Sequence, residues 1–76
     1  MSRVMELMTT ARAVRRARLR AGMSVASLAK AAGISDQTVY EIEKDGRKRG
    51  PRIETVAAIA DALGVEIEAL IPEEAA

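Results

Sequence analysis

The sequence predicts an all-α domain built from five short helices, and two observations support this fold class. The apolar residues make up 49% of the 76 positions and include a single aromatic side chain. They lack the alternation with polar residues that is typical of strands in a small sandwich or barrel. Five glycines divide the chain into pieces of helical length, and apolar residues recur at helical spacing within those pieces. A chain this short has room for one hydrophobic core.

Cap residues delimit the first two helices. Thr9 or Thr10 is expected to cap the first helix, which ends before Gly22. Residues 1–10 then form an N-terminal extension or an extra helical turn. Ser24 is expected to cap a second helix over 24–32. A hydroxyl in this position accepts a hydrogen bond from an amide of the first turn, and a glycine after a helix adopts a left-handed backbone at little cost.

The third and fourth helices are separated by a basic loop. The third is expected over 35–43 with Ser35 as its cap, and the loop 45–52 follows. Pro51 is expected near the start of the fourth helix, where the missing amide of proline costs little. This helix ends before Gly64, and its buried face is expected to consist of Ile53, Val56, Ile59, Ala60 and Leu63.

A short fifth helix is expected at about 66–71, before Pro72. The boundaries therefore divide the chain into the extension 1–10, a helical domain over 11–71 and a disordered acidic tail over 72–76.

The small net charge hides a strong asymmetry. All 12 lysines and arginines lie within residues 1–52, whereas six of the 11 acidic residues lie after them, so that the whole chain carries only +1. Such asymmetry is typical of a surface that faces nucleic acid. It is equally compatible with two oppositely charged, solvated faces that attract each other.

The absence of cysteine and histidine excludes several classes of function. Disulfides, Cys/His zinc sites and catalysis by a His or Cys partner are all excluded. Ser27 and Lys30 match a short β-lactamase pattern, but the second motif of that pattern is missing. For these reasons together we expect no enzyme, no cofactor, no metal site and no small-molecule ligand.

No targeting or membrane segment is recognisable, so we expect a cytoplasmic protein with no membrane partner.

The second and third helices meet the steric requirements of a helix-turn-helix. Two helices that cross steeply within a short turn need a small residue inside the first helix, a glycine in the turn and an apolar residue after it. The second helix must then bury one side and leave its front free. The positions that meet these requirements are Leu28, Ala29, Gly33, Ile34, Val39 and Ile42.

The segments 21–43 and 53–70 resemble the phage Cro and repressor type (XRE-like) helix-turn-helix domains. The resemblance implies a five-helix, lambda-repressor-like domain that binds double-stranded DNA sequence-specifically through its third helix. It therefore implies a transcriptional regulator of repressor type. The Ala-rich helices without histidine also fit a designed DNA binder. The resemblance also implies an ion pair between Arg18 and Glu43, and Arg18 lies on the apolar line of its helix, where a charge needs a partner. Val25 departs from the family, which often has Gln there.

The recognition surface follows from helix geometry. With Val39 and Ile42 inward, the N-terminal half of the third helix faces the major groove in this docking mode. Gln can pair with adenine, and Asp or Glu can accept a hydrogen bond from cytosine N4. Gln37 and Glu41 are predicted as the main base readers, Asp36 and Thr38 as secondary ones, and Tyr40 as a contact to a phosphate or a thymine methyl. The alternative is a solvated helix face.

Contacts to the DNA backbone are predicted from two basic groups and two helix N-termini. Arg12, Arg15, Arg16 and Arg20 share a face of the first helix, and the basic loop flanks the recognition helix. For the helix arginines, solubility and pairing with the acidic half remain an alternative. The predicted phosphate contacts are Ser24, Ser35, Arg47, Lys48, Arg49, Arg52 and Arg16.

Two further questions stay open at this level. The acidic third helix also suits a basic protein partner, so the alternative function is a protein-interaction module or an antitoxin-like adaptor. A homodimer through the region of the fourth and fifth helices is possible, because Ile67, Leu70 and Ile71 can form a small apolar patch there or complete the core.

Overall fold

The computed structural model describes residues 9–44 and 51–71, and these ranges form an all-helical fold. They contain four α-helices and one 3-10 helix and no strand. The elements are α2 (Thr10–Arg20), α3 (Val25–Ala32), α4 (Asp36–Ile42), α5 (Ile53–Leu63) and the 3-10 helix η1 (Ile67–Leu70). The first eight residues of the predicted extension, the loop residues Arg47, Lys48 and Arg49, and the predicted tail 72–76 lie outside the described residues.

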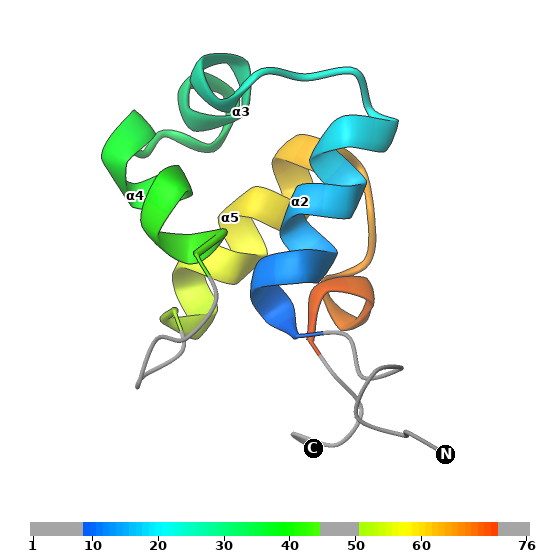
Figure 1. Cartoon of the computed structure of the whole chain (residues 1–76). Helices are drawn as coiled ribbons and strands as arrows, with labels where there is room; N and C mark the ends of the chain where they lie inside the picture. The colour runs from blue at the N-terminus through cyan, green and yellow to red at the C-terminus, as the bar shows by residue number, and fades with distance from the viewer. Residues whose placement is uncertain (1–8, 45–50, 72–76) are drawn as a thin grey trace.

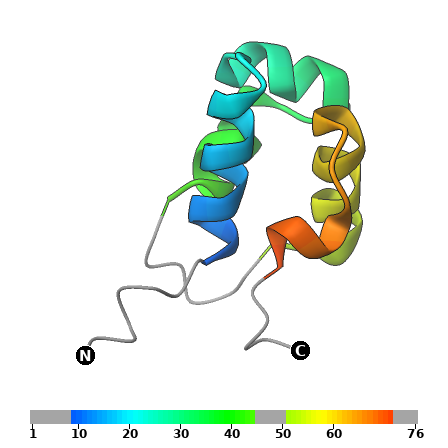
Figure 2. The same cartoon turned by 90° about the vertical axis from the view of Figure 1, so that its right-hand side faces the viewer.

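The helices pack around one another so that α4 lies on the outside of the molecule. In Figure 1, α3 and α4 meet at the upper left, and α5 passes behind α2. Contacts join α3 to both α4 and α5, and η1 packs against α2 and α5. Figure 2 shows η1 at the bottom of the molecule, between the lower ends of these two helices. In the described part of the chain no helix is long and apolar enough to cross a membrane.

Three helices begin at the hydroxyl caps that the sequence predicts. Thr9 Oγ1 accepts a hydrogen bond from the Arg12 amide at 3.2 Å, which decides between the two candidate threonines in favour of Thr9. The Oγ atoms of Ser24 and Ser35 accept from the amides of Ser27 and Thr38. These bonds satisfy amides that have no partner inside their own helix.

The core lies between all five elements. The side chains of Val14, Leu28, Val39, Ile59 and Leu70 are almost completely buried, and each comes from a different element. Because every element contributes one of these side chains, burial of apolar surface fixes the mutual positions of the helices.

Two expectations need correction. The predicted fifth α-helix is not confirmed, because residues 67–70 form a single 3-10 turn, a tighter geometry that is common in pieces this short. Ile53 was expected on the buried face of its helix, but it is 61% exposed. It is the first helical residue, directly after the N-cap Arg52, and so it precedes the part of α5 that contacts the core. Pro51 lies one residue before that cap, near the start of the helix as the sequence predicts.

Candidate nucleic-acid interface

The turn between α3 and α4 has the geometry of a helix-turn-helix. Gly33 ends α3 with a left-handed backbone at φ 74°. The Ile34 amide donates to the Ala29 carbonyl at 2.9 Å, the bond that closes a helix end of this kind. Ala29 is only 1% exposed, so a larger side chain at this position would have to displace its neighbours in the core. Ile34 is half-buried and packs against the core.

One side of α4 is buried and the other is exposed to solvent. Val39 and Ile42 point into the core with Leu28 of α3. The exposed residues of the helix are Asp36, Gln37, Tyr40 and Glu41, and the Tyr40 side chain is 60% exposed. An exposed row of one amide, two carboxylates and one phenol provides hydrogen-bond donors and acceptors to a partner that docks against this helix.

A hydrogen bond within this row links Gln37 to Glu41. Gln37 Nε2 donates to Glu41 Oε2 at 3.1 Å. The two residues are one helical turn apart, a spacing at which side chains meet. The bond uses one of the two amide hydrogens of Gln37, so Oε1 and the second hydrogen remain available to a docking partner. The four-residue spacing of Gln37 and Glu41 in the sequence already contains this signal.

Thr38 takes part in the cap of the helix. Its amide donates to Ser35 Oγ at 3.1 Å, and the two hydroxyl oxygens lie 2.8 Å apart. Ser24 has a similar arrangement at the start of α3, where its hydroxyl accepts from the Ser27 amide and donates to Ser27 Oγ. The hydroxyls of Ser24, Ser35 and Thr38 therefore already have partners within their own helix starts.

Arg18 and Glu43 join α2 to the end of α4. Arg18 Nε and Nη2 donate to the two carboxylate oxygens of Glu43 at 2.7 and 3.0 Å. Arg18 Nη1 also donates to the Met23 carbonyl at 3.0 Å, a third contact that sequence reasoning missed because no spacing rule points to it. The side chains are 12% and 9% exposed. The hydrogen bond to Glu43 raises the pKa of Arg18 above its ordinary value.

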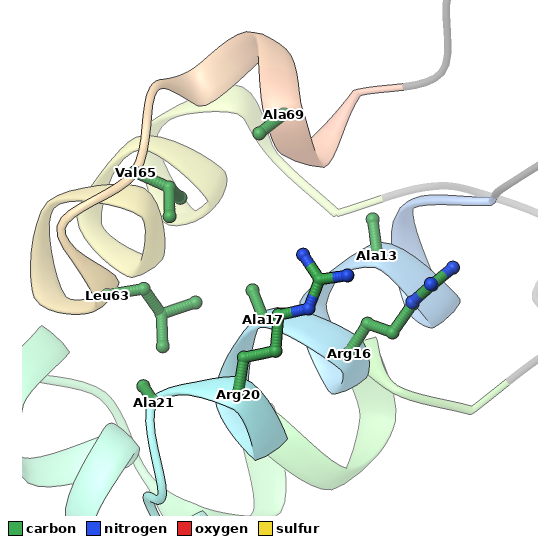
Figure 3. A pocket seen from close by; sticks show the side chains of 8 residues that line it. All are labelled: Ala13, Arg16, Ala17, Arg20, Ala21, Leu63, Val65 and Ala69. Atoms are coloured by element: carbon green, nitrogen blue, oxygen red, sulfur yellow. The ribbon is translucent and has the colours of Figure 1, made fainter.

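The basic residues lie on different sides of the domain. Arg52 is exposed at the start of α5, close in sequence to the loop residues that lie outside the described ranges. Lys44 is exposed just after α4 and extends the basic loop at its N-terminal end. Its position next to that loop in the sequence is the signal that identifies it. Arg16 instead lines a hollow between α2 and the α5–η1 connection (Figure 3).

The position of Arg16 follows from the rotation of the helix. At 3.6 residues per turn, Arg16 and Arg20 lie about 160° around α2 from Arg18. Arg18 faces the end of α4 through its bonds to Glu43. Arg16 and Arg20 therefore project from the side of α2 that is turned away from α4, whereas Arg15 lies about 60° from Arg18 by the same rotation.

The comparison with known proteins agrees with this geometry. A family model described as "Helix-turn-helix" matches residues 14–70, from the middle of α2 to the last residue of η1. A search of curated proteins found no match. The matched region contains the turn, the buried side of α4 and the Arg18–Glu43 pair.

Proposed function

We propose that this chain, which belongs to the Cro and repressor type (XRE-like) helix-turn-helix family, binds double-stranded DNA sequence-specifically by placing α4 in the major groove. Helix-turn-helix domains generally bind DNA in this way. The observation that supports the proposal most is the division of α4 into a buried side and an exposed polar side. A helix that is anchored by Val39, Ile42 and the Arg18–Glu43 pair is held rigidly while its front stays free.

Gln37 is the main base reader in this proposal. Its hydrogen bond to Glu41 uses one amide hydrogen and leaves one acceptor and one donor, which is the pair that a bidentate contact to adenine requires. Glu41 then has two roles, because its second carboxylate oxygen can accept from cytosine N4. Asp36 and Tyr40 are exposed beside them and serve as secondary contacts. Thr38 acts mainly through the cap, since its hydroxyl is bonded to Ser35.

Arg52 and the loop residues Arg47, Lys48 and Arg49 are the proposed phosphate contacts. They flank α4 in the chain, and each neutralised phosphate releases counterions and makes the affinity depend on salt. The amide-rich starts of α3 and α4, at Ser24 and Ser35, complete this set. We leave Arg16 out of it, because its side chain lines the hollow on the opposite side of α2.

A repressor that occupies two half-sites needs two copies of this domain, since recognition helices one helical turn of DNA apart read paired half-sites. Leu70 is 1% exposed and therefore belongs to the core, not to an intermolecular surface. Ile67 and Ile71 are half-buried and also pack against the core. A dimer through α5 and η1 would thus have to use the exposed residues of these elements, such as Ile53 and Glu68.

A second candidate function is a protein-interaction module. The exposed side of α4 contains two carboxylates, Asp36 and Glu41, which phosphates repel and a basic protein surface attracts. Tyr40 is exposed next to them, and tyrosine is enriched in protein interfaces.

A selection from random duplexes tests the proposal and separates it from this alternative. The wild-type protein should enrich one short sequence, and Gln37→Ala should relax the preference at one or two base pairs. Glu54→Ala, an exposed substitution on α5, is the control and should leave the preferred sequence unchanged. If no duplex shows saturable binding at low or moderate salt, the DNA proposal is wrong and the protein-interaction reading replaces it.

A further inference from the structure

A hollow of about 440 Å³ separates α2 from the α5–η1 connection. Its lining is shown in Figure 3 and consists of Ala13, Arg16, Ala17, Arg20, Ala21, Leu63, Val65 and Ala69. This volume is within the range of sites that hold ligands or partner side chains, roughly 300–1,000 Å³.

The floor of the hollow is apolar and made of small residues. Ala13, Ala17 and Ala21 follow one another at four-residue spacing along α2. Ala69 faces them from η1 (Figure 3). Ala21 and Ala69 are exposed and Ala17 is only half-buried. Small side chains in such a row leave a shallow groove into which the side-chain ridge of another helix can pack.

Two arginines stand on one wall of the hollow. Arg16 and Arg20 are one helical turn apart on α2, about 6 Å along its axis. Neither has a carboxylate partner in the described part of the chain, where the ion pair that forms joins Arg18 to Glu43. Both arginines line the hollow together with Ala17 of the same helix (Figure 3). The wall therefore presents two positive charges next to an apolar floor.

This surface is separate from the proposed DNA interface. Arg16 and Arg20 lie about 160° around α2 from Arg18, which faces α4. Arg16 and Arg20 therefore do not point toward phosphates of DNA that is bound along α4. A polymer of phosphates would also leave the apolar floor uncovered.

We propose that the hollow is a docking site for an acidic amphipathic helix of a partner protein. Carboxylates four residues apart on such a helix match the spacing of Arg16 and Arg20, so that two ion pairs form along one wall. Leucine or similar side chains on the adjacent face of the partner helix cover Ala17, Ala21 and Ala69. The charge pairs select the partner, and burial of the apolar floor supplies the remaining affinity.

A displayed library of helical 16-residue peptides tests this proposal. Peptides enriched on the wild-type protein should contain two acidic residues four positions apart beside an apolar face. An enriched peptide should bind the double variant Arg16→Glu/Arg20→Glu at least about tenfold more weakly, because attraction becomes repulsion at both positions. The control Lys30→Glu/Lys44→Glu carries the same change of charge at two exposed positions outside the hollow, and it should retain binding within about twofold.

A second variant keeps the test independent of charge. Ala17→Met fills the floor of the hollow from a half-buried position and should also weaken peptide binding. Circular dichroism establishes that each variant is folded, and duplex binding by Arg16→Glu/Arg20→Glu should match the wild type.

Three results would overturn the proposal. The first is enrichment of peptides without an acidic pair, or no saturable binding up to about 1 mM peptide. The second is equal loss of binding in the Lys30/Lys44 control. The third is a concentration-dependent dimer of the wild type that Arg16→Glu/Arg20→Glu dissociates, because the hollow would then hold a second copy of this chain.

Discussion

Arg18 on α2 holds both carboxylate oxygens of Glu43, 25 residues later in the chain, and at the same time donates to the Met23 carbonyl. One guanidinium thereby ties together the first helix, the loop that precedes α3 and the end of the proposed recognition helix. A bidentate pair of this kind restricts orientation as well as distance. The angle at which α4 leaves the core is therefore set by this pair together with the burial of Val39 and Ile42.

Removing either partner of the pair should destabilise the domain. We expect Arg18→Met and Glu43→Gln each to lower the free energy of unfolding by about 1–3 kcal/mol, since each leaves a partly buried charged group without its partner. Urea unfolding followed by circular dichroism measures the change. Arg20→Met, at an exposed position, is the matched control and should stay within about 0.5 kcal/mol of the wild type. Equal effects of Arg18→Met and Arg20→Met would contradict a role for the pair.

The stability should depend little on pH near neutrality. The chain has no histidine or cysteine, the side chains that ordinarily titrate between about pH 6 and 9. Glu43 raises the pKa of Arg18, so the Arg18–Glu43 pair makes its full contribution to the free energy of unfolding at every pH below the ordinary arginine pKa. This contribution is lost only when the pH rises through the raised pKa. Urea unfolding at several pH values from 6 to 9 should vary by less than about 0.5 kcal/mol, and a steep slope in this window would contradict the prediction.

Gly33 should resist replacement by alanine. Its φ of 74° is left-handed, while an added Cβ would meet no atom within 4 Å. The cost of Gly33→Ala is therefore conformational strain, about 1–2 kcal/mol in the free energy of unfolding. Gly33→Asn should cost less, because asparagine enters this region more easily. If thermal and urea unfolding show that Gly33→Ala is more stable than Gly33→Asn, backbone strain does not determine the stability of these variants.

The small size of Ala29 should be required for both the fold and the proposed DNA binding. Ala29→Leu adds three carbon atoms at a position that is 1% exposed, and overpacking of this kind costs about 1–3 kcal/mol. Ala26→Leu makes the same change at an exposed position of the same helix and should leave the stability nearly unchanged. Urea unfolding and duplex titration compare the two variants. Equal stability and equal duplex affinity of Ala29→Leu and Ala26→Leu would contradict the requirement for a small side chain at position 29.

The salt dependence of duplex binding should identify the phosphate contacts. Arg52→Ala should reduce the slope of log K against log salt by about one, the contribution of one neutralised phosphate. Arg20→Ala removes the same charge from the side of α2 turned away from α4, and its slope should equal that of the wild type. Fluorescence titrations at four salt concentrations provide the slopes. If Arg20→Ala reduces the slope as much as Arg52→Ala does, phosphates contact the side of α2 that is turned away from α4, and the proposed interface is wrong.

The sequence alone determined the local features of this fold. Hydrogen bonds between near neighbours define the helix starts, so Ser24 and Ser35 were recognisable as caps, and Thr9 was one of two candidates. The positive φ of Gly33 likewise depends on a turn of a few residues. Helical spacing was sufficient to separate Val39 and Ile42 from the exposed residues of α4, because rotation per residue is nearly constant along a helix.

The rotation of each helix and the point at which its core contact begins depend on packing between elements that are distant in the chain. Ile53 fitted the apolar pattern of α5, yet it is exposed, because the core does not extend as far as the first turn. Residues 67–70 form a 3-10 turn that packs against α2 and α5, two elements that are distant from each other in the chain. Arg16 faces the hollow beside η1 because the bonds of Arg18 to Glu43 fix the rotation of α2. Such long-range contacts join residues far apart in the chain, and no local spacing specifies them.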